Sequence, residues 1–166
     1  VRHNFDGVEV YNHVCHWINA KGEGTVHWQR MLHHYAGTRA FASDDAHLNG
    51  AHPGWNGGWI VVNAPKLASE DILHSIKLGN FYSSCGPDFI SIENSASKVM
   101  IRTSPVVRAW LVGPSWLGRR FAKGDEELFT EVEFDVPSDW PFAHIEIEDA
   151  RGRRAWTNTL FVNSHS

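Results

Sequence analysis

Residues 39–47 read Arg39-Ala40-Phe41-Ala42-Ser43-Asp44-Asp45-Ala46-His47, a strand-like run followed by an aspartate and a histidine two positions apart. In extended backbone the side chains of residues i and i+2 lie on the same face. An aspartate oxygen and a neutral imidazole nitrogen are both good ligands for zinc, manganese or iron. The spacing therefore predicts that Asp45 and His47 bind one divalent metal ion. A turn or a helix cap is the alternative interpretation of the same residues.

Histidines are concentrated around this stretch. Eight of the eleven histidines lie in the first 52 residues, namely His3, His13, His16, His27, His33, His34, His47 and His52. Neutral histidine is the commonest metal ligand in proteins. The concentration of histidines therefore favours the metal-binding interpretation.

The composition is that of an ordinary globular protein, with 166 residues, 42% of them hydrophobic and 20% charged. This length suffices for one domain or two small ones. The net charge of −4 creates no general field for nucleic acid or anionic membranes. There is no apolar run long enough to span a membrane, and two cysteines cannot form a disulfide framework or a four-cysteine zinc site. We therefore expect a cytoplasmic protein that binds neither nucleic acid nor membranes.

The first half of the sequence alternates between strand and helix patterns. Residues 7–12 and 59–62 are strand-like, as are residues 39–42. Apolar residues at helical spacing predict one helix around residues 28–35 and a second from about Ser69 to Gly79. This alternation is typical of α/β architectures, in which functional groups gather at the carboxyl ends of the strands.

The second half reads as short strands separated by turn residues. The predicted strands are residues 89–93, 98–103, 107–112, 129–136, 143–148 and 155–162. Period-two patterning predicts that Val132 and Phe134 face a core, and that Ile145 and Ile147 do so while His144, Glu146 and Glu148 face water. We therefore expect two domains, residues 1–84 and residues 85–166, the second a small antiparallel β-sandwich.

Three blocks of sequence resemble the latter part of a PHP (polymerase and histidinol phosphatase) domain, and most closely its metal-dependent phosphoesterase and CehA-like branches. The blocks are residues 5–12 (Phe-Asp-Gly-Val-Glu-Val-Tyr-Asn), residues 42–47 and residues 79–87 (Gly-Asn-Phe-Tyr-Ser-Ser-Cys-Gly-Pro). The resemblance implies a distorted (β/α)7 barrel that binds two or three divalent metal ions, zinc, manganese or iron. It puts Asp45 and His47 on the terminal metal motif of the family. The implied fold class is α/β plus all-β, a partial barrel followed by the β-sandwich.

Four further residues are candidates for the same site. The Glu9 side chain points opposite to Val8 and Val10, so it faces either a barrel centre or water. Related phosphoesterases carry a metal-binding histidine near the place of His13 and His16, although each can equally be a surface or core histidine. Arg39 could bind a substrate phosphate or form a structural salt bridge. No catalytic residue is assigned apart from these metal ligands.

One departure from the family pattern bears on the partners of this chain. The family barrel opens with an H-x-H strand, and no H-x-H occurs in this sequence. The resemblance thus implies that an amino-terminal half, another subunit or a homo-oligomer completes the barrel, and that the isolated chain is inactive. Asp44 could orient the His47 imidazole, or serve as a turn or cap residue.

The predicted function is metal-dependent hydrolysis of a small phosphorylated or ester substrate by metal-activated water, that is, a phosphoesterase. The alternative is a non-catalytic β-rich module that binds carbohydrate or protein, or a degenerate PHP relative. Six tryptophans are candidates for such a binding surface: Trp55, Trp59, Trp110, Trp116, Trp140 and Trp156.

Overall fold

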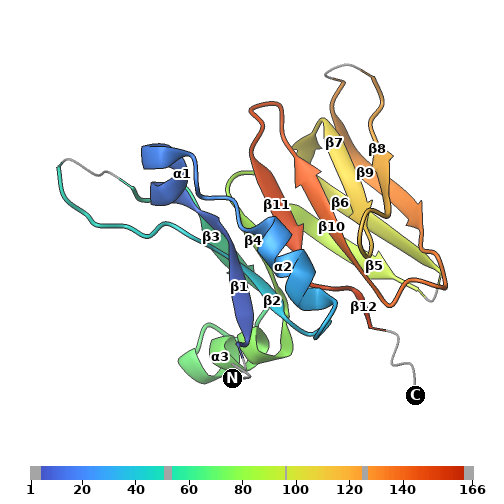
Figure 1. Cartoon of the computed structure of the whole chain (residues 1–166), viewed down its shortest axis with the longest axis horizontal. Helices are drawn as coiled ribbons and strands as arrows, with labels where there is room; N and C mark the ends of the chain where they lie inside the picture. The colour runs from blue at the N-terminus through green and yellow to red at the C-terminus, as the bar shows by residue number, and fades with distance from the viewer. Residues whose placement is uncertain (1–4, 51–53, 96, 125–126, 163–166) are drawn as a thin grey trace. The chain divides into compact units, whose positions relative to one another are not determined.

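The structure is a computed structural model that describes residues 5–50, 54–95, 97–124 and 127–162 (Figure 1). The chain divides into two compact units, Val1–Cys85 and Gly86–Ser166. It is a mixed α/β protein that consists mostly of strands, and its described residues form no closed barrel. No helix in the described ranges is long and apolar enough to cross a membrane.

A parallel strand pair opens the first unit. Strand β1 (Gly7–Asn12) pairs in parallel with β2 (Arg39–Ser43), and helices α1 (His13–Asn19) and α2 (Thr25–Leu32) form the connection that a parallel pair requires. The buried Trp28 of α2 donates its indole N–H to the carbonyl of Thr38 at 2.8 Å. The strand predicted at residues 7–12 is confirmed. The predicted helix begins and ends about three residues earlier than expected, so Tyr35 lies beyond its end and is 60% exposed.

The second half of this unit contains β3 (Trp59–Val62), α3 (Ser69–Leu78) and β4 (Phe81–Ser84). Helix α3 is confirmed as predicted, and Gly79 ends it in the left-handed conformation with φ 79°. Strands β3 and β4 run antiparallel. This pairing departs from the all-parallel arrangement of a (β/α) barrel.

The Ser83 hydroxyl connects β4 to β2. Ser83 is fully buried, accepts a hydrogen bond from the Ala42 amide at 2.9 Å and donates one to the Ala40 carbonyl at 2.9 Å. Buried backbone groups are costly when they lack partners. One side-chain oxygen therefore satisfies two polar groups of the β2 backbone.

The second unit is built from two antiparallel sheets. One sheet has the order β5-β6-β9, from β5 (Phe89–Asn94), β6 (Lys98–Val106) and β9 (Phe129–Asp135). The other contains β7 (Arg108–Val112), β8 (Gly118–Phe121), β10 (Phe142–Glu148) and β11 (Arg154–Thr157) in the order β11-β10-β7-β8, and β12 (Phe161–Val162) pairs with β10. The segment predicted as one strand, residues 155–162, forms two strands, β11 and β12. Strands β4 and β8 were not predicted from the sequence. Phe121 of β8 meets Phe129 of β9 edge to face, 4.8 Å between ring centroids.

The burial predicted from alternating side chains is confirmed for β9 but not for β10. In β9, Val132 and Phe134 are buried while Glu131 and Glu133 are exposed, as predicted. In β10 every residue is buried, so the prediction that its polar side chains face water is wrong. The reason is that Glu146 and Glu148 lie near arginines of the neighbouring strands, and His144 contacts Glu146 of its own strand.

Candidate functional site

Asp45 and His47 lie in the loop that joins β2 to β3 and extends away from both strands (Figure 1). The Asp45 Oδ1 and His47 Nε2 atoms are 3.6 Å apart, and the two side chains are 44% and 52% exposed. Asp45 has φ 52°, a left-handed conformation. The two side chains therefore approach each other through a turn, not through the extended backbone that the sequence predicted. A left-handed non-glycine residue costs free energy, and such residues cluster at functional sites.

Asn12 connects Asp45 to Glu9. Its Nδ2 group donates to Glu9 Oε2 at 3.1 Å and to Asp45 Oδ2 at 3.4 Å. The Ser43 hydroxyl donates to the other oxygen of Glu9, Oε1. Asn12 and Ser43 are direct partners in the parallel β1–β2 register, so the carboxyl ends of the two strands meet here. The structure thus brings Glu9, Asp45 and His47 into one cluster, which we call the Glu9/Asp45/His47 cluster.

The orientation of the Asn12 amide is fixed by a second contact. Its Oδ1 atom accepts a hydrogen bond from the Cys15 amide at 2.8 Å and so caps the start of α1. Because the oxygen faces a donor, the NH₂ group must face the carboxylates. Asn12 was not singled out from the sequence, and the one available signal was its place at the end of a predicted strand.

His13 and His16 lie on α1 and contact Tyr11. The His13 Nδ1 atom is 3.4 Å from the Tyr11 hydroxyl, and the His16 ring centroid is 5.5 Å from that of Tyr11. Burial, together with the nearby Cys85, Glu23 and Asp44, raises the pKa of Tyr11 to about 12. Both histidines are therefore placed beside Tyr11, and their role as metal ligands stays a prediction.

Asp44 binds backbone amides of the same loop. Its carboxylate accepts hydrogen bonds from the amides of Asn56, Gly57 and Gly58 at 2.8, 2.7 and 2.8 Å. Burial acts to raise the pKa of Asp44, but these three amides and the nearby His13 hold it below its usual value. Asp44 thus acts as a turn residue, the second of the two roles considered for it.

Arg39 lies at the opposite end of β2 from Asp45. Its Nη2 group donates to the carbonyl of Lys77 near the end of α3. The structure therefore does not bring Arg39 together with the Glu9/Asp45/His47 cluster, and substrate binding by Arg39 stays a prediction.

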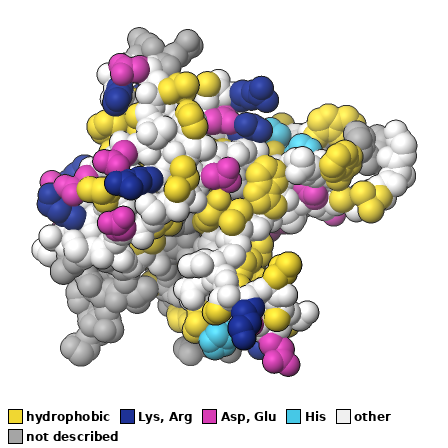
Figure 2. All heavy atoms as spheres, turned by 180° about the vertical axis from the view of Figure 1, so that it is seen from behind, with side chains coloured by type: hydrophobic (Ala, Val, Ile, Leu, Met, Phe, Trp, Pro, Cys, Tyr) yellow, Lys and Arg dark blue, Asp and Glu magenta, His cyan; other side chains and the backbone are white. Residues whose placement is uncertain are grey.

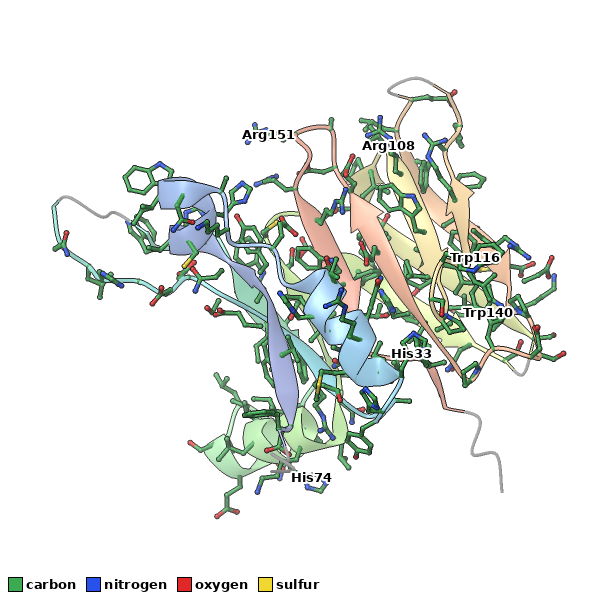
Figure 3. All side chains as sticks on the ribbon, viewed as in Figure 1. His33, His74, Arg108, Trp116, Trp140 and Arg151 are labelled. Atoms are coloured by element: carbon green, nitrogen blue, oxygen red, sulfur yellow. The ribbon has the colours of Figure 1, made fainter. Side chains whose placement is uncertain are left out.

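The remaining histidines are dispersed. Figure 3 shows His33 just after α2 and His74 on α3, both away from the β2–β3 loop. His3 and His52 lie outside the described residues. Among the residues that the structure describes, no group of three or more histidine, cysteine, aspartate or glutamate side chains is placed to hold a metal ion. The side chains of the Glu9/Asp45/His47 cluster are therefore linked through Asn12 and through the Asp45–His47 contact, and they do not converge on one point as metal ligands must.

A second polar cluster, on β10 and its neighbours, was missed by the sequence analysis. The buried His144 contacts Glu146 at 3.1 Å between Nε2 and Oε1. Glu148 accepts hydrogen bonds from Arg108 of β7 at 2.5 Å and from Arg154 of β11 at 3.0 Å. Both neighbours pair with Glu148 in the strand register. If one partner of such a buried ion pair is removed, the remaining charge is left uncompensated, and the fold is destabilised.

The surface near the loop is partly apolar. Figure 2 shows hydrophobic side chains next to histidine and acidic side chains on the projection that this loop and α1 form. Trp17, Leu48 and Trp55 are 57%, 77% and 64% exposed. Among the six candidate tryptophans, Trp55 and Trp116 are exposed, Trp59 and Trp110 half-buried, and Trp140 and Trp156 buried.

Comparisons with known protein families, with curated proteins and with solved structures found no match to this chain. Function is therefore argued from its own residues.

Proposed function

We propose that this chain is part of a metal-dependent hydrolase of the PHP type, a phosphoesterase whose metal centre includes Asp45, His47 and Glu9. The observation that carries the proposal is the position of the Asn12 amide, which donates to the carboxylates of both Glu9 and Asp45. Both carboxylates accept from the Asn12 NH₂ group, which lies between them. The His47 imidazole borders the same carboxylate of Asp45.

The donor types at this point fit a divalent cation. Carboxylate oxygens and an imidazole nitrogen bind zinc, manganese and iron alike. The two carboxylates create a negative potential between them, and the NH₂ group of Asn12 occupies that position, so a cation would have to take the place of this group. The three side chains would supply fewer than the four ligands of a typical zinc site, so further ligands must come from outside the cluster.

A bound divalent cation lowers the pKa of its water and so supplies hydroxide near neutral pH for attack on a phosphate or carboxylic ester. In this scheme Asp45 and His47 bind the cation, and Glu9 shares it. Ser43 and Asn12 orient the Glu9 carboxylate through their hydrogen bonds. Arg39 would bind a substrate phosphate only if the completed site extends to the start of β2, where Arg39 lies.

The Glu9/Asp45/His47 cluster lacks enough ligands for a metal centre, which supports the proposal that another part of the protein or another subunit completes it. A PHP-type centre holds two or three metal ions, and its remaining ligands would come from an H-x-H strand in an amino-terminal half or another subunit. Large apolar side chains of the first unit are exposed, among them Trp17, Val26 and Leu67. Only a contiguous apolar patch marks an interaction site, so these separate side chains are compatible with the proposed partner without requiring it. A homo-oligomer is the alternative means of completing the site.

A manganese titration followed by NMR tests the site directly. Paramagnetic Mn²⁺ broadens the amide signals of residues near its binding site. We expect the signals of Asn12, Asp45 and His47 to broaden first in the 166-residue chain. Broadening that begins at the adjacent His33 and His34 instead, with the loop unaffected, would overturn the proposal.

Matched variants make the test specific. Asp45→Asn and His47→Ala should each weaken zinc binding measured by calorimetry. Asp139→Asn and His74→Ala remove an exposed residue of the same type elsewhere and should leave zinc binding unchanged. Equal zinc affinity in all four variants would show that the predicted ligands are wrong. In a chain that includes the H-x-H strand, hydrolysis of a model phosphodiester should depend on the same two residues.

A non-catalytic binding module is the second candidate, and the exposure of Trp116 favours it. Trp116 is 88% exposed on a turn closed by hydrogen bonds from Gly113 to Leu117 and from Leu117 to Pro114. An exposed indole on such a turn can stack on a sugar ring or a peptide side chain. Retarded migration in gels that contain polysaccharide, lost in Trp116→Ala, would support this candidate. Unchanged migration across a panel of polysaccharides would remove its carbohydrate form.

A further inference from the structure

Asp44 closes the base of the loop that carries Asp45 and His47. Its Oδ1 atom accepts from the amides of both Gly57 and Gly58, and its Oδ2 atom accepts from the amide of Asn56. One carboxylate thus binds three successive backbone N–H groups at the far end of the loop. Charge-assisted hydrogen bonds of this kind are about twice as strong as neutral ones.

The backbone of Asp44 makes a second connection, to α1. The Asp44 carbonyl accepts a hydrogen bond from the Val14 amide at 3.2 Å. Asp44 therefore joins three segments that are distant in the sequence, namely the end of β2, the start of α1 and residues 56–58. The first two of these segments carry Asn12 and Ser43, which contact Glu9.

The glycines at the far end of the loop are required for this contact. A Cβ atom on Gly57 would lie 2.2 Å from the His13 ring, and one on Gly58 would lie 2.6 Å from the Ser43 carbonyl oxygen. Neither position can therefore carry a side chain unless its neighbours move. The close approach of residues 57 and 58 to β2 and α1 is what lets their amides reach the Asp44 carboxylate.

We propose that Asp44 is a positioning residue for the cation site, which it serves by holding both ends of the β2–β3 loop. This inference rests on the proposed function, because it assumes that Asp45 and His47 bind a cation. Asp45 follows Asp44 directly and adopts a left-handed backbone conformation. If the loop ends were free, cation binding would have to order Asp45 and His47 at a cost in entropy. Loss of residues that orient metal ligands lowers metal affinity by about 10- to 100-fold.

Two measurements on the full chain test this role. Asp44→Asn keeps the shape of the side chain but removes its charge, and Gly58→Ala disturbs the contact from the donor side. In both variants we expect faster hydrogen exchange at the amides of residues 56–58 and zinc affinity at least about tenfold weaker. Asp45→Asn is the matched control, and it should weaken zinc binding while these amides stay protected.

The outcomes separate the positioning role from the proposed function. Fast exchange at residues 56–58 in Asp44→Asn with unchanged zinc affinity would refute the positioning role and leave the metal site standing. Unchanged exchange would show that Asp44 does not hold the loop. Slow exchange in the wild-type chain without any zinc binding at Asp45 and His47 would refute the proposed function, and the positioning role with it. A circular dichroism spectrum equal to that of the wild type confirms that each variant is folded.

Discussion

Removal of the Asp149 side chain should destabilise the second unit. The Asp149 carboxylate accepts hydrogen bonds from the backbone amides of Arg151 and Arg153 at 2.9 and 3.0 Å and from Arg153 Nε at 2.8 Å. The side chain is 11% exposed, and it holds the turn between β10 and β11. Hydrogen bonds to a charged group contribute about 1.5–3 kcal/mol each, but they are not additive. Because Arg153 is 46% exposed, its ion pair adds little. We therefore expect Asp149→Ala to lower the free energy of unfolding by about 2–3 kcal/mol.

The assay is urea unfolding, with the hydrogen exchange of β10 and β11 amides as the local probe. A slope of about 1 kcal/mol per molar urea converts this loss to a midpoint about 2–3 M lower. Asp135→Ala is the matched control, since Asp135 is 89% exposed and its change should stay within about 0.5 kcal/mol. A midpoint for Asp149→Ala that equals the control would refute the reasoning.

The pH dependence of this effect has a definite sign. Burial acts to raise the pKa of Asp149, but the bonds from Arg153 and Arg151 outweigh it and hold the pKa below its usual value. A lowered folded-state pKa stabilises the protein above the unfolded-state value of about 3.9, and this contribution is lost as the pH falls through the folded-state pKa. The difference between the wild type and Asp149→Asn should therefore be full at neutral pH and shrink below about pH 4. A difference that grows on acidification would contradict the assigned cause.

Three further changes have expected outcomes. Ser83→Ala removes the buried hydrogen bonds to the Ala42 amide and the Ala40 carbonyl and should lower the free energy of unfolding by about 2 kcal/mol, with denaturant titration as the check. In an ultraviolet titration of tyrosine ionisation, Tyr11→Phe should remove the step near pH 12, because Tyr11 stays protonated well above the usual value of about 10. Gly113→Ala would place a Cβ atom 2.3 Å from the Trp140 ring and should lower stability by about 1–3 kcal/mol, while Gly118→Ala, with 3.4 Å to its nearest atom, should change thermal stability little.

The strands of this protein were largely predictable because period-two patterns are local. Strand β9 has one buried and one exposed face, and its sequence alternates accordingly. Strand β10 has the same alternation, yet both faces are buried. The difference lies in Arg108 and Arg154, which reach Glu148 from adjacent strands. Strand pairing depends on residues far apart in the sequence, so one segment alone could not reveal it.

The closeness of Asp45 and His47 was predictable from the sequence, but the geometry that produces it was not, and their role as ligands stays a prediction. The spacing of Asp45 and His47 correctly suggested that the two side chains lie close, yet the left-handed φ of Asp45 produces the approach. The role of Asn12 depends on the β1–β2 register, and the role of Asp44 depends on the return of residues 56–58 to the end of β2. Both are tertiary contacts. Residue types therefore indicated the chemistry, whereas the arrangement required the fold.

The aspartate at position 45 is difficult to explain by stability alone. Glycine would adopt its φ of 52° at lower cost, and either glycine or asparagine would remove the carboxylate that shares the Asn12 amide with Glu9. The chain instead keeps both charges and separates them with one neutral amide from Asn12. A neutral amide offsets two negative charges only in part, whereas a divalent cation would offset both. The charge at Asp45 would thus contribute to cation binding, which is the role that the proposed function gives it.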